Sequence, residues 1–365
     1  MKPNKNIQNF PIFIDGKFYE NNTDIFPSLN PHNEEIWATF SVAGKSEVDL
    51  AIAAARRCLN EGEWPKMLAS DRGKLLLKLA DLIELHANEI GKIETNDSGK
   101  LLAETATQTQ YVAEYYRYFA GLADKIQGST LPIDKPDMHV FTSCEPIGVV
   151  AAVVPWNAQM FLTATKLAPA LAAGCTIIIK ASEIAPCSLL YFARLIKEAG
   201  IPDGVVSVIT GDEKNCAIPL TTHPDIDRIA FTGGPKVAKQ IVINSSENFA
   251  VTTLELGGKS PIVVFEDADI EGAVNGIIAG NYGASGQSCV AGTRVIVHDS
   301  IKKVLVEMLS KRAESIVTGD PKNNETHVGP LCTNKQINLI EKTLKKAKSQ
   351  GAKIVFGGSR LNQKG

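Results

Sequence analysis

Closely spaced cysteine pairs are absent from this 365-residue chain. Its seven cysteines are an odd number at irregular spacing, and no C-x-x-C motif occurs. The sequence therefore indicates neither a zinc site nor a disulfide framework, and we expect no metal. Free thiols are typical of a reducing compartment.

Long apolar runs and an excess of basic residues are absent as well. No apolar run approaches the length of a membrane span, and the first residues lack the continuous apolar region of a secretory signal. The net charge of -2 provides no basic surface for nucleic acid or an acidic membrane. We therefore expect a soluble, cytoplasmic protein that binds neither.

The first part of the chain has the pattern of helices. Ser46, with Asp49 three residues later, predicts a helix start. A second helix is predicted over residues 71–90 and a third over residues 103–122. The apolar stripe of the second helix consists of Leu75, Leu76, Leu79, Leu82, Ile83 and Leu85. Residues 129–141 contain Pro and Gly breakers and are expected to form extended chain or short strands.

From Gly148 onward, short β-branched runs alternate with helical stretches. Strands are predicted at 149–154, 176–179, 205–209, 228–231, 251–254, 261–265 and 295–298. Helices are predicted at 162–173 and 188–198, and from about 270 and 301. This alternation predicts right-handed βαβ units and a parallel sheet. A chain of this length is expected to divide into two or more domains.

Two motifs follow predicted strands of the first set. Asn157 ends the run Pro155-Trp156-Asn157, where its amide can donate to an oxyanion, or it can simply be a turn residue. Lys180 and Glu183 can hold ribose hydroxyls, or they can form a surface ion pair. Glu183 would also repel a 2′-phosphate, which favours NAD over NADP. The G-x-G-x-x-G loop of the usual Rossmann fold is missing.

Two more motifs follow later strands. Gly233 and Gly234 precede Pro235 at a helix start, where bare backbone N–H groups can receive a phosphate. The same pair can also be a plain helix start. Glu255 ends an apolar strand, so we expect burial to raise its pKa, as suits a general base.

Cys289 lies in the run Gly286-Gln287-Ser288-Cys289-Val290, among small and flexible residues. A substrate can approach a thiol in such a segment. The alternative is a small buried hydrophobe, the usual role of a free cysteine.

These motifs, taken in order, make the chain resemble the aldehyde dehydrogenase superfamily over nearly its whole length. The specific features are LELGGKSP, GQSC, PWN, K-x-S-E and FTGG. The resemblance implies Cys289 as nucleophile, Glu255 as general base, Asn157 in the oxyanion hole and Lys166 in a proton relay. It implies that the adenosine ribose of NAD is held by Lys180 and Glu183. The full set of expected cofactor-binding residues is Trp156, Lys180, Ser182, Glu183, Thr232, Gly233, Gly234, Leu256 and Gly257.

The same resemblance implies a fold and a reaction. We expect a Rossmann-like parallel-sheet domain formed by residues 1–125 and 147–256, a small β oligomerisation segment at 126–146, and a second α/β catalytic domain at 257–365. The reaction is NAD-dependent oxidation of an aldehyde to a carboxylic acid through a cysteine thiohemiacetal and thioester, which water activated by Glu255 hydrolyses. A homo-oligomer, dimer or tetramer, is expected for the full-length protein.

Several features depart from the family pattern. Gly234 and Ala238 replace the usual Ser and Gly of the phosphate turn, and the later E-x-F-G-P motif does not occur. We therefore expect a truncated catalytic domain that folds poorly. The alternatives are an impaired dinucleotide-binding fragment or a relative that transfers the acyl group to coenzyme A. The substrate stays open among aliphatic, aromatic and amino aldehydes, with Met160 and Phe161 either at an apolar entrance or in the core.

Overall fold

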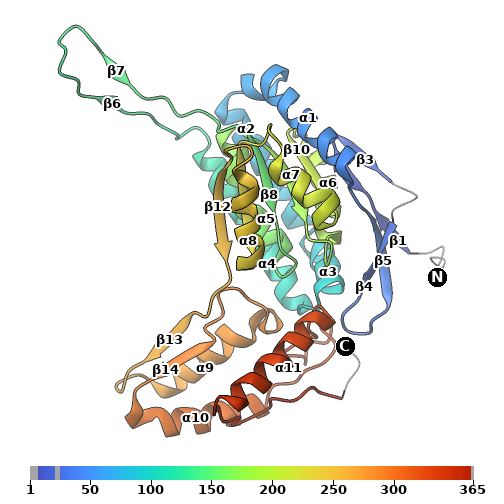
Figure 1. The fold of residues 1–365 in the computed structure, drawn as a ribbon, viewed down its shortest axis with the longest axis vertical. Helices are drawn as coiled ribbons and strands as arrows, with labels where there is room; N and C mark the ends of the chain where they lie inside the picture. Colours follow the sequence, from blue (N-terminus) through green and yellow to red (C-terminus); the bar gives the residue numbers. More distant parts are fainter. Residues whose placement is uncertain (1–6, 21–24, 363–365) are drawn as a thin grey trace.

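The computed structural model describes residues 7–20 and 25–362, and its centre is a seven-stranded sheet (Figure 1). Five parallel strands form most of it, and two short antiparallel strands complete one edge. In spatial order they are β12 (Val251–Leu256), β11 (Arg228–Gly233), β8 (Val149–Val153), β9 (Thr176–Ala181), β10 (Val206–Thr210), β2 (Ile12–Ile14) and β3 (Lys17–Tyr19). The predicted parallel sheet and the α/β fold class are confirmed. β9 and β10 are rich in β-branched and apolar residues, and all of their residues are buried. This is typical of parallel strands that are covered on both faces.

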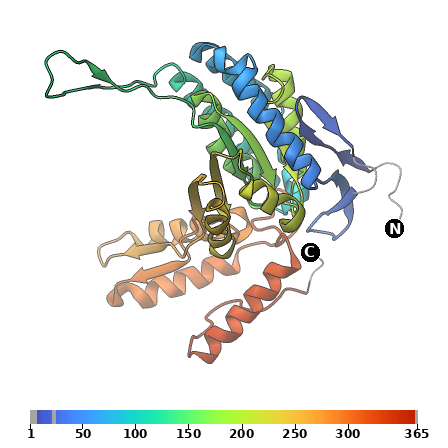
Figure 2. The ribbon, with the colours of Figure 1, turned by 45° about the horizontal axis from the view of Figure 1, so that its top comes forward.

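Helices cover both faces of this sheet (Figure 2). On one face α5 (Gln159–Ala173) and α6 (Cys187–Ala199) contact the strands, and α2 (Ala69–Leu85), α3 (Ala87–Ser98) and α4 (Leu102–Leu122) pack over them. On the other face lie α1 (Lys45–Glu61), α7 (Ile218–Thr222) and α8 (Pro235–Ser245). We call this body, up to residue 256, the first lobe.

The strand order reverses beside β8. From β8 the chain adds β9 and β10 on one side, and then crosses to add β11 and β12 on the other. Such a switch point leaves a crevice outside the carboxyl ends of two neighbouring strands, and ligands of open α/β sheets bind there. The segments that follow β8 and β11 are therefore placed for ligand binding.

A second, smaller lobe follows β12 through residues 257–260 (Figure 1). Two parallel strands, β13 (Pro261–Val264) and β14 (Arg294–Val297), pack with α9 (Ile270–Tyr282) and α10 (Asp299–Glu314). Its core is small and consists of Val264, Val274, Ile277 and Leu305 with partly buried neighbours. An amphipathic helix, α11 (Asn334–Ser349), completes the lobe and buries none of its residues.

A long hairpin projects from the first lobe (Figure 1). Its strands β6 (Thr130–Leu131) and β7 (Val140–Phe141) are antiparallel, which confirms the prediction of extended chain at 129–141. Residues 126–139 are all exposed. The hairpin therefore makes almost no contribution to the core.

The prediction of a helical first part was wrong for the residues before α1. Three strands there, β1 (Gln8–Phe10), β4 (Ile25–Leu29) and β5 (Ile36–Ser41), form a separate sheet in the order β1-β5-β4. β4 and β5 are as long as the strands that were predicted, but they mix apolar residues with Pro, Ser and Thr and lack a continuous β-branched run. β1, β2 and β3 have three residues each, which is too few for a pattern.

Two helix boundaries also differ from prediction. The N-cap of helix α1 is Gly44, not Ser46, because the Glu47 carboxylate accepts a hydrogen bond of 2.8 Å from the Gly44 N–H. The helix predicted over 71–90 is broken at His86, whose Nδ1 lies 3.0 Å from Tyr191 Oη in a hydrogen bond. The break leaves Leu85 76% exposed, outside the apolar stripe to which we assigned it. Helix α11 was not predicted.

Candidate active site

One cavity of about 770 Å³ brings together the four predicted catalytic residues and two of the nine predicted cofactor-binding residues. It lies beside α5 on the face of β11 and β12 that no helix covers, and the loop before β14 closes one end. The predicted site residues that line it are Asn157, Lys166, Thr232, Glu255, Leu256 and Cys289. These residues come from both lobes.

Cys289 stands on the loop that joins α9 to β14. Its side chain is partly buried and free, so a substrate in the cavity has access to the thiol. This agrees with the exposed-nucleophile interpretation and not with a core cysteine. We call residues 284–290 the nucleophile loop.

Asn157 connects the first lobe to this loop. The residue follows β8 at the switch point, and its Nδ2 donates a hydrogen bond of 2.9 Å to the backbone oxygen of Gln287. An amide nitrogen carries two hydrogens, so one remains for an oxygen in the cavity. The amide is therefore both an anchor of the nucleophile loop and a donor beside the thiol.

Lys166 projects from α5 and is only 9% exposed. Its Nζ donates to Thr232 Oγ1 at 2.6 Å and to the Leu162 carbonyl at 3.4 Å. Burial lowers the pKa of Lys166 to about 8, and the nearby charge of Glu255 offsets part of that shift. An ammonium with such a pKa can give and take a proton near neutral pH.

Glu255 is exposed, so the expectation of an apolar environment around it was wrong. β12 is the edge strand of the sheet, and Thr253 and Glu255 point from it to the same uncovered face. The carboxylate therefore meets the cavity and solvent instead of a packed helix.

Lys180 and Glu183 form an ion pair at the end of β9, with Nζ and Oε2 2.8 Å apart. The Lys180 side chain is 7% exposed, whereas Glu183 is 51% exposed and has room for further hydrogen bonds. Ser182 lies between them and accepts from the Ile184 N–H at 3.3 Å. Trp156, half-buried, follows the neighbouring strand β8. These residues share the carboxyl edge of the sheet with the cavity but do not line it.

Backbone at the ends of β11 and β12 is open to a ligand. Gly234 is the N-cap of α8, and no atom lies within 4 Å of the position that a Cβ at Gly234 or Gly257 would occupy. Gly233 is different, because a Cβ there would lie 2.5 Å from the Phe231 ring. The free N–H groups at the start of α8 suit a phosphate. Together with the Lys180–Glu183 pair, this edge fits the phosphates and ribose of a dinucleotide.

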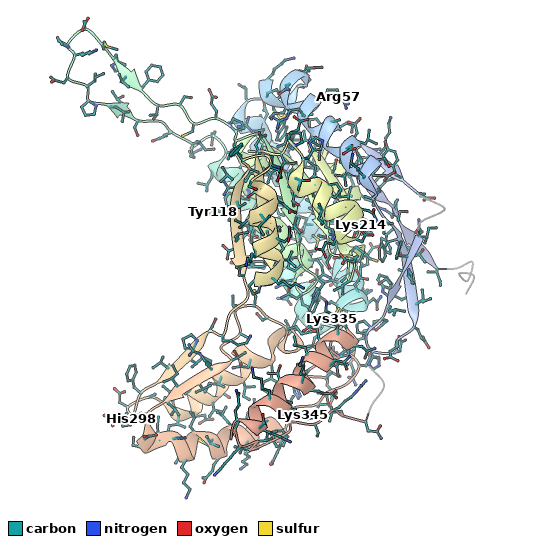
Figure 3. The ribbon with its side chains drawn as sticks, viewed as in Figure 1. Arg57, Tyr118, Lys214, His298, Lys335 and Lys345 are labelled. Atoms are coloured by element: carbon teal, nitrogen blue, oxygen red, sulfur yellow. The ribbon has the colours of Figure 1, made fainter. Side chains whose placement is uncertain are left out.

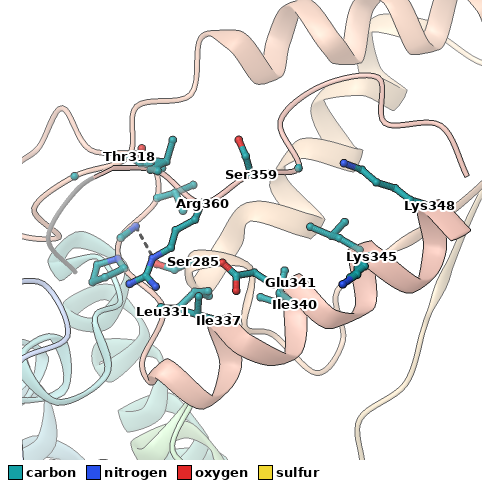
Figure 4. A pocket seen from close by; sticks show the side chains of 17 residues that line it. Ser285, Thr318, Leu331, Ile337, Ile340, Glu341, Lys345, Lys348, Ser359 and Arg360 are labelled. Carbon is teal, nitrogen blue, oxygen red and sulfur yellow. Dashed lines mark hydrogen bonds between the residues drawn. The ribbon is translucent and has the colours of Figure 1, made fainter.

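A second cavity, of about 610 Å³, lies between α11 and the segments 318–331 and 358–361 (Figure 4). None of the predicted catalytic or cofactor residues lines it. Ser285 of the nucleophile loop reaches its edge, where Ser285 Oγ accepts a hydrogen bond of 3.0 Å from the Gly329 N–H.

Histidine is absent from the described lining of the active-site cavity. His298, for example, lies far out on the second lobe (Figure 3). Nor do His, Cys, Asp or Glu side chains gather in groups of three that could hold a metal ion within residues 7–20 and 25–362.

Sequence reasoning missed the residues that hold the nucleophile loop in place. They are Glu104 of α4, Ser285 and Gln287 of the loop itself, and the 329–332 segment. Only Gly286, which adopts a φ of 70°, offered a local signal of a special turn.

A search of protein families matches residues 18–365 to the aldehyde dehydrogenase family. One similar protein is (Z)-2-((N-methylformamido)methylene)-5-hydroxybutyrolactone dehydrogenase of Acinetobacter baylyi, 52% identical over 96% of this chain and 72% of that protein. Another is aldehyde dehydrogenase 1 of Tanacetum cinerariifolium, 41% identical over 97% of this chain and 71% of that protein. The solved NAD+ complex of an aldehyde dehydrogenase from Bacillus cereus superposes with a TM-score of 0.95 at 39% identity, covering 98% of this chain and 73% of that one. In the described residues, no helix combines the length and the apolar character needed to cross a membrane.

Proposed function

The chain belongs to the aldehyde dehydrogenase family, and from that premise we propose that it oxidises an aldehyde to a carboxylic acid with NAD. The observation that carries the proposal is the shared cavity, because Cys289, Asn157, Lys166 and Glu255 all line it. A thiol, an amide donor, an amine and a carboxylate are the groups that a covalent oxidation followed by hydrolysis requires.

NAD binds at the carboxyl edge of the sheet in this proposal. Lys180 and Glu183, with Ser182 and Trp156, would hold the adenosine ribose. The backbone around Thr232, Gly233 and Gly234 would receive the phosphates, and Leu256 and Gly257 would complete the cofactor-binding residues. The chemistry that bound NAD supplies is acceptance of a hydride from the carbon attached to Cys289.

The first half of the reaction belongs to Cys289. The Sγ thiolate attacks the aldehyde carbon, a C–S bond forms, and the carbonyl oxygen becomes the oxyanion of a thiohemiacetal. Asn157 Nδ2 and the Cys289 backbone N–H donate to that oxyanion. Loss of hydride from the same carbon converts the thiohemiacetal into a thioester.

The second half releases the acid. The Glu255 carboxylate takes a proton from water while the water oxygen attacks the thioester carbon. The C–S bond then breaks and returns Cys289 to the thiolate. Glu255, which meets solvent at the edge strand, releases this proton to water. Lys166, with a pKa of about 8 and a hydrogen bond to Thr232, takes part in the relay by exchanging its own proton with water in the cavity.

The cavity walls indicate an aldehyde with an apolar body. Phe161, Leu162 and Tyr115 line the side formed by α5 and α4, and Val290 lines the opposite side. Met160, in contrast, is a core residue, 1% exposed. We therefore propose that Phe161, and not Met160, contacts the apolar part of the aldehyde.

The proposal includes a domain assignment and an assembly. Residues 1–125 and 147–256 form the NAD-binding domain, residues 126–146 an oligomerisation segment, and residues 257–365 the catalytic domain. The projecting and largely exposed hairpin supports an intermolecular role for 126–146, in a cytoplasmic homo-oligomer.

Replacement of the thiol tests the proposed function. Cys289→Ser should abolish aldehyde-dependent NADH formation while NADH still binds, measured by absorbance at the NADH band and by fluorescence titration. Cys144→Ser is the matched control, since Cys144 is free but lies exposed near the hairpin, away from the cavity. Undiminished turnover by Cys289→Ser would remove this thiol from the mechanism.

A further inference from the structure

The nucleophile loop begins with a left-handed turn. Three successive residues have positive φ: Ala284 at 53°, Ser285 at 54° and Gly286 at 70°. Glycine adopts this conformation freely, whereas a residue with a side chain is strained in it. A turn of this kind persists only where its surroundings hold it.

Four hydrogen bonds from outside the loop hold it. The Ala284 N–H donates to Glu104 Oε1 at 3.2 Å, and Ser285 Oγ accepts from Gly329. The Gln287 carbonyl accepts from Asn157, and Gln287 Oε1 accepts from the Cys332 N–H at 2.9 Å. Of these anchors, only the Glu104 contact attaches a charged group to the strained backbone.

Glu104 is an unusual place for a carboxylate. It sits near the start of α4, half-buried, and its Oε2 atom is covered and lacks a hydrogen-bond partner among the described residues. Burial raises the pKa of Glu104, and the Ala284 N–H and the charge of Lys100 act in the opposite direction. Burying a carboxylate costs free energy. The position of Glu104 is explained if the nucleophile loop needs the hydrogen bond from the Ala284 N–H to keep its conformation.

We propose that Glu104 is a positioning residue that holds the nucleophile loop in its left-handed turn, so that Cys289 faces the cavity beside Asn157. The inference rests on the proposed function only in taking Cys289 as the nucleophile. The structural part of the proposal, that Glu104 holds the nucleophile loop in its left-handed turn, does not depend on the reaction. The two parts can therefore be tested separately.

Hydrogen exchange measures the loop directly. Glu104→Ala removes the acceptor of the Ala284 N–H, so exchange of amides in 284–290, followed by mass spectrometry, should accelerate about tenfold to a hundredfold. Glu104→Gln keeps an acceptor without the charge, and a few-fold acceleration is expected. Glu114→Gln, on an exposed part of the same helix, is the control and should leave exchange unchanged.

Kinetics measure the positioning. In Glu104→Ala the kcat for aldehyde should fall about tenfold to a hundredfold while the Kd for NADH stays the same, since the cofactor edge lies elsewhere. Ala284→Gly should partly restore kcat in the Glu104→Ala background, because glycine adopts the turn without strain and needs the anchor less. A general loss of stability would give neither the unchanged Kd nor the rescue.

Three outcomes overturn the proposal. They are unchanged exchange in 284–290 for both Glu104 variants, faster exchange with unchanged kcat, and a fall in kcat that Ala284→Gly leaves untouched. If Glu104→Ala does not fold, the same test is made with Glu104→Gln. Its few-fold faster exchange and its lower kcat should be reversed by Ala284→Gly. If Cys289→Ser stays active but exchange still responds to Glu104, the proposed function fails and the anchoring role survives.

Discussion

Lys166 gives the sharpest test of the site's electrostatics. Its ammonium is buried beside Thr232, and its pKa falls from 10.5 to about 8 because burial penalises the charge. A shift of that size means that the folded state holds the charged form at a cost of about 3 kcal/mol. Lys166→Met keeps the length and the apolar stem of the side chain and removes the charge.

The direction in which stability changes with pH follows from proton binding at Lys166. Between pH 8 and 10.5 the folded state binds fewer protons at Lys166 than the unfolded state, so this group makes the protein more stable as the pH rises. Below pH 8 the full penalty applies, and above 10.5 it is gone. The variant also loses the hydrogen bond to Thr232, worth about 1 kcal/mol.

We therefore expect the difference in stability to change sign with pH. At pH 7 Lys166→Met should be more stable than the wild type by about 2 kcal/mol, and near pH 10.5 less stable by about 1 kcal/mol. Urea unfolding followed by circular dichroism across this range measures the difference, with the exposed Lys239→Met as control. A difference that stays constant with pH would refute a buried ammonium at Lys166.

Three further predictions concern other carboxylates. Glu255→Gln should give a burst of NADH near one equivalent per active site and then stall, because thioester hydrolysis lacks its base; stopped-flow absorbance checks this, and normal steady-state turnover would exclude the role. Glu183→Ser should weaken NAD binding about tenfold and reduce the difference in affinity between NAD and NADP, both measured by fluorescence titration. A wild type that already binds NADP more tightly than NAD would contradict this role of Glu183. Asp97 accepts from Ser28 and from the Cys187 N–H, and burial raises its pKa to about 6. Between pH 4 and 6 the folded protein binds more protons at Asp97 than the unfolded chain does. The stability of the wild type should therefore fall by about 3 kcal/mol relative to Asp97→Asn as the pH rises from 4 to 6. A difference in melting temperature between the two proteins that stays constant with pH would contradict the buried charge.

The parallel sheet could be read from the sequence because its strands carry the signal locally. Runs such as residues 176–179 are β-branched and buried on both faces, and a motif follows four of the five strands of the first set. The sequence of a single strand does not show which strands will be its neighbours in the sheet. Glu255 was therefore expected in an apolar setting, whereas β12 turned out to be the uncovered edge strand.

The anchors of the nucleophile loop could not be predicted for a similar reason. Glu104 and Ala284 are far apart in the chain, and nothing near either residue indicates the other. The left-handed conformation of Ala284 and Ser285 is imposed by such distant contacts and is not favoured by the residues themselves. Among the N-terminal strands, β1, β2 and β3 were missed because three residues leave too little pattern, and β4 and β5 because they mix apolar residues with polar ones.

The connection between the lobes has a consequence for how the enzyme tolerates heat. Residues 257–260 join β12 to β13, and neither Gly257 nor Gly258 packs closely enough to fix the angle between the lobes. Alignment of Glu255 with Cys289 then depends on contacts between the lobes, among them the hydrogen bonds of Glu104 with Ala284, of Asn157 with Gln287 and of Leu102 with Pro321. These polar contacts lie between two separate hydrophobic cores and are weaker than either core. Warming should break these contacts first, so that activity disappears at a temperature where the sheet and helices are still intact.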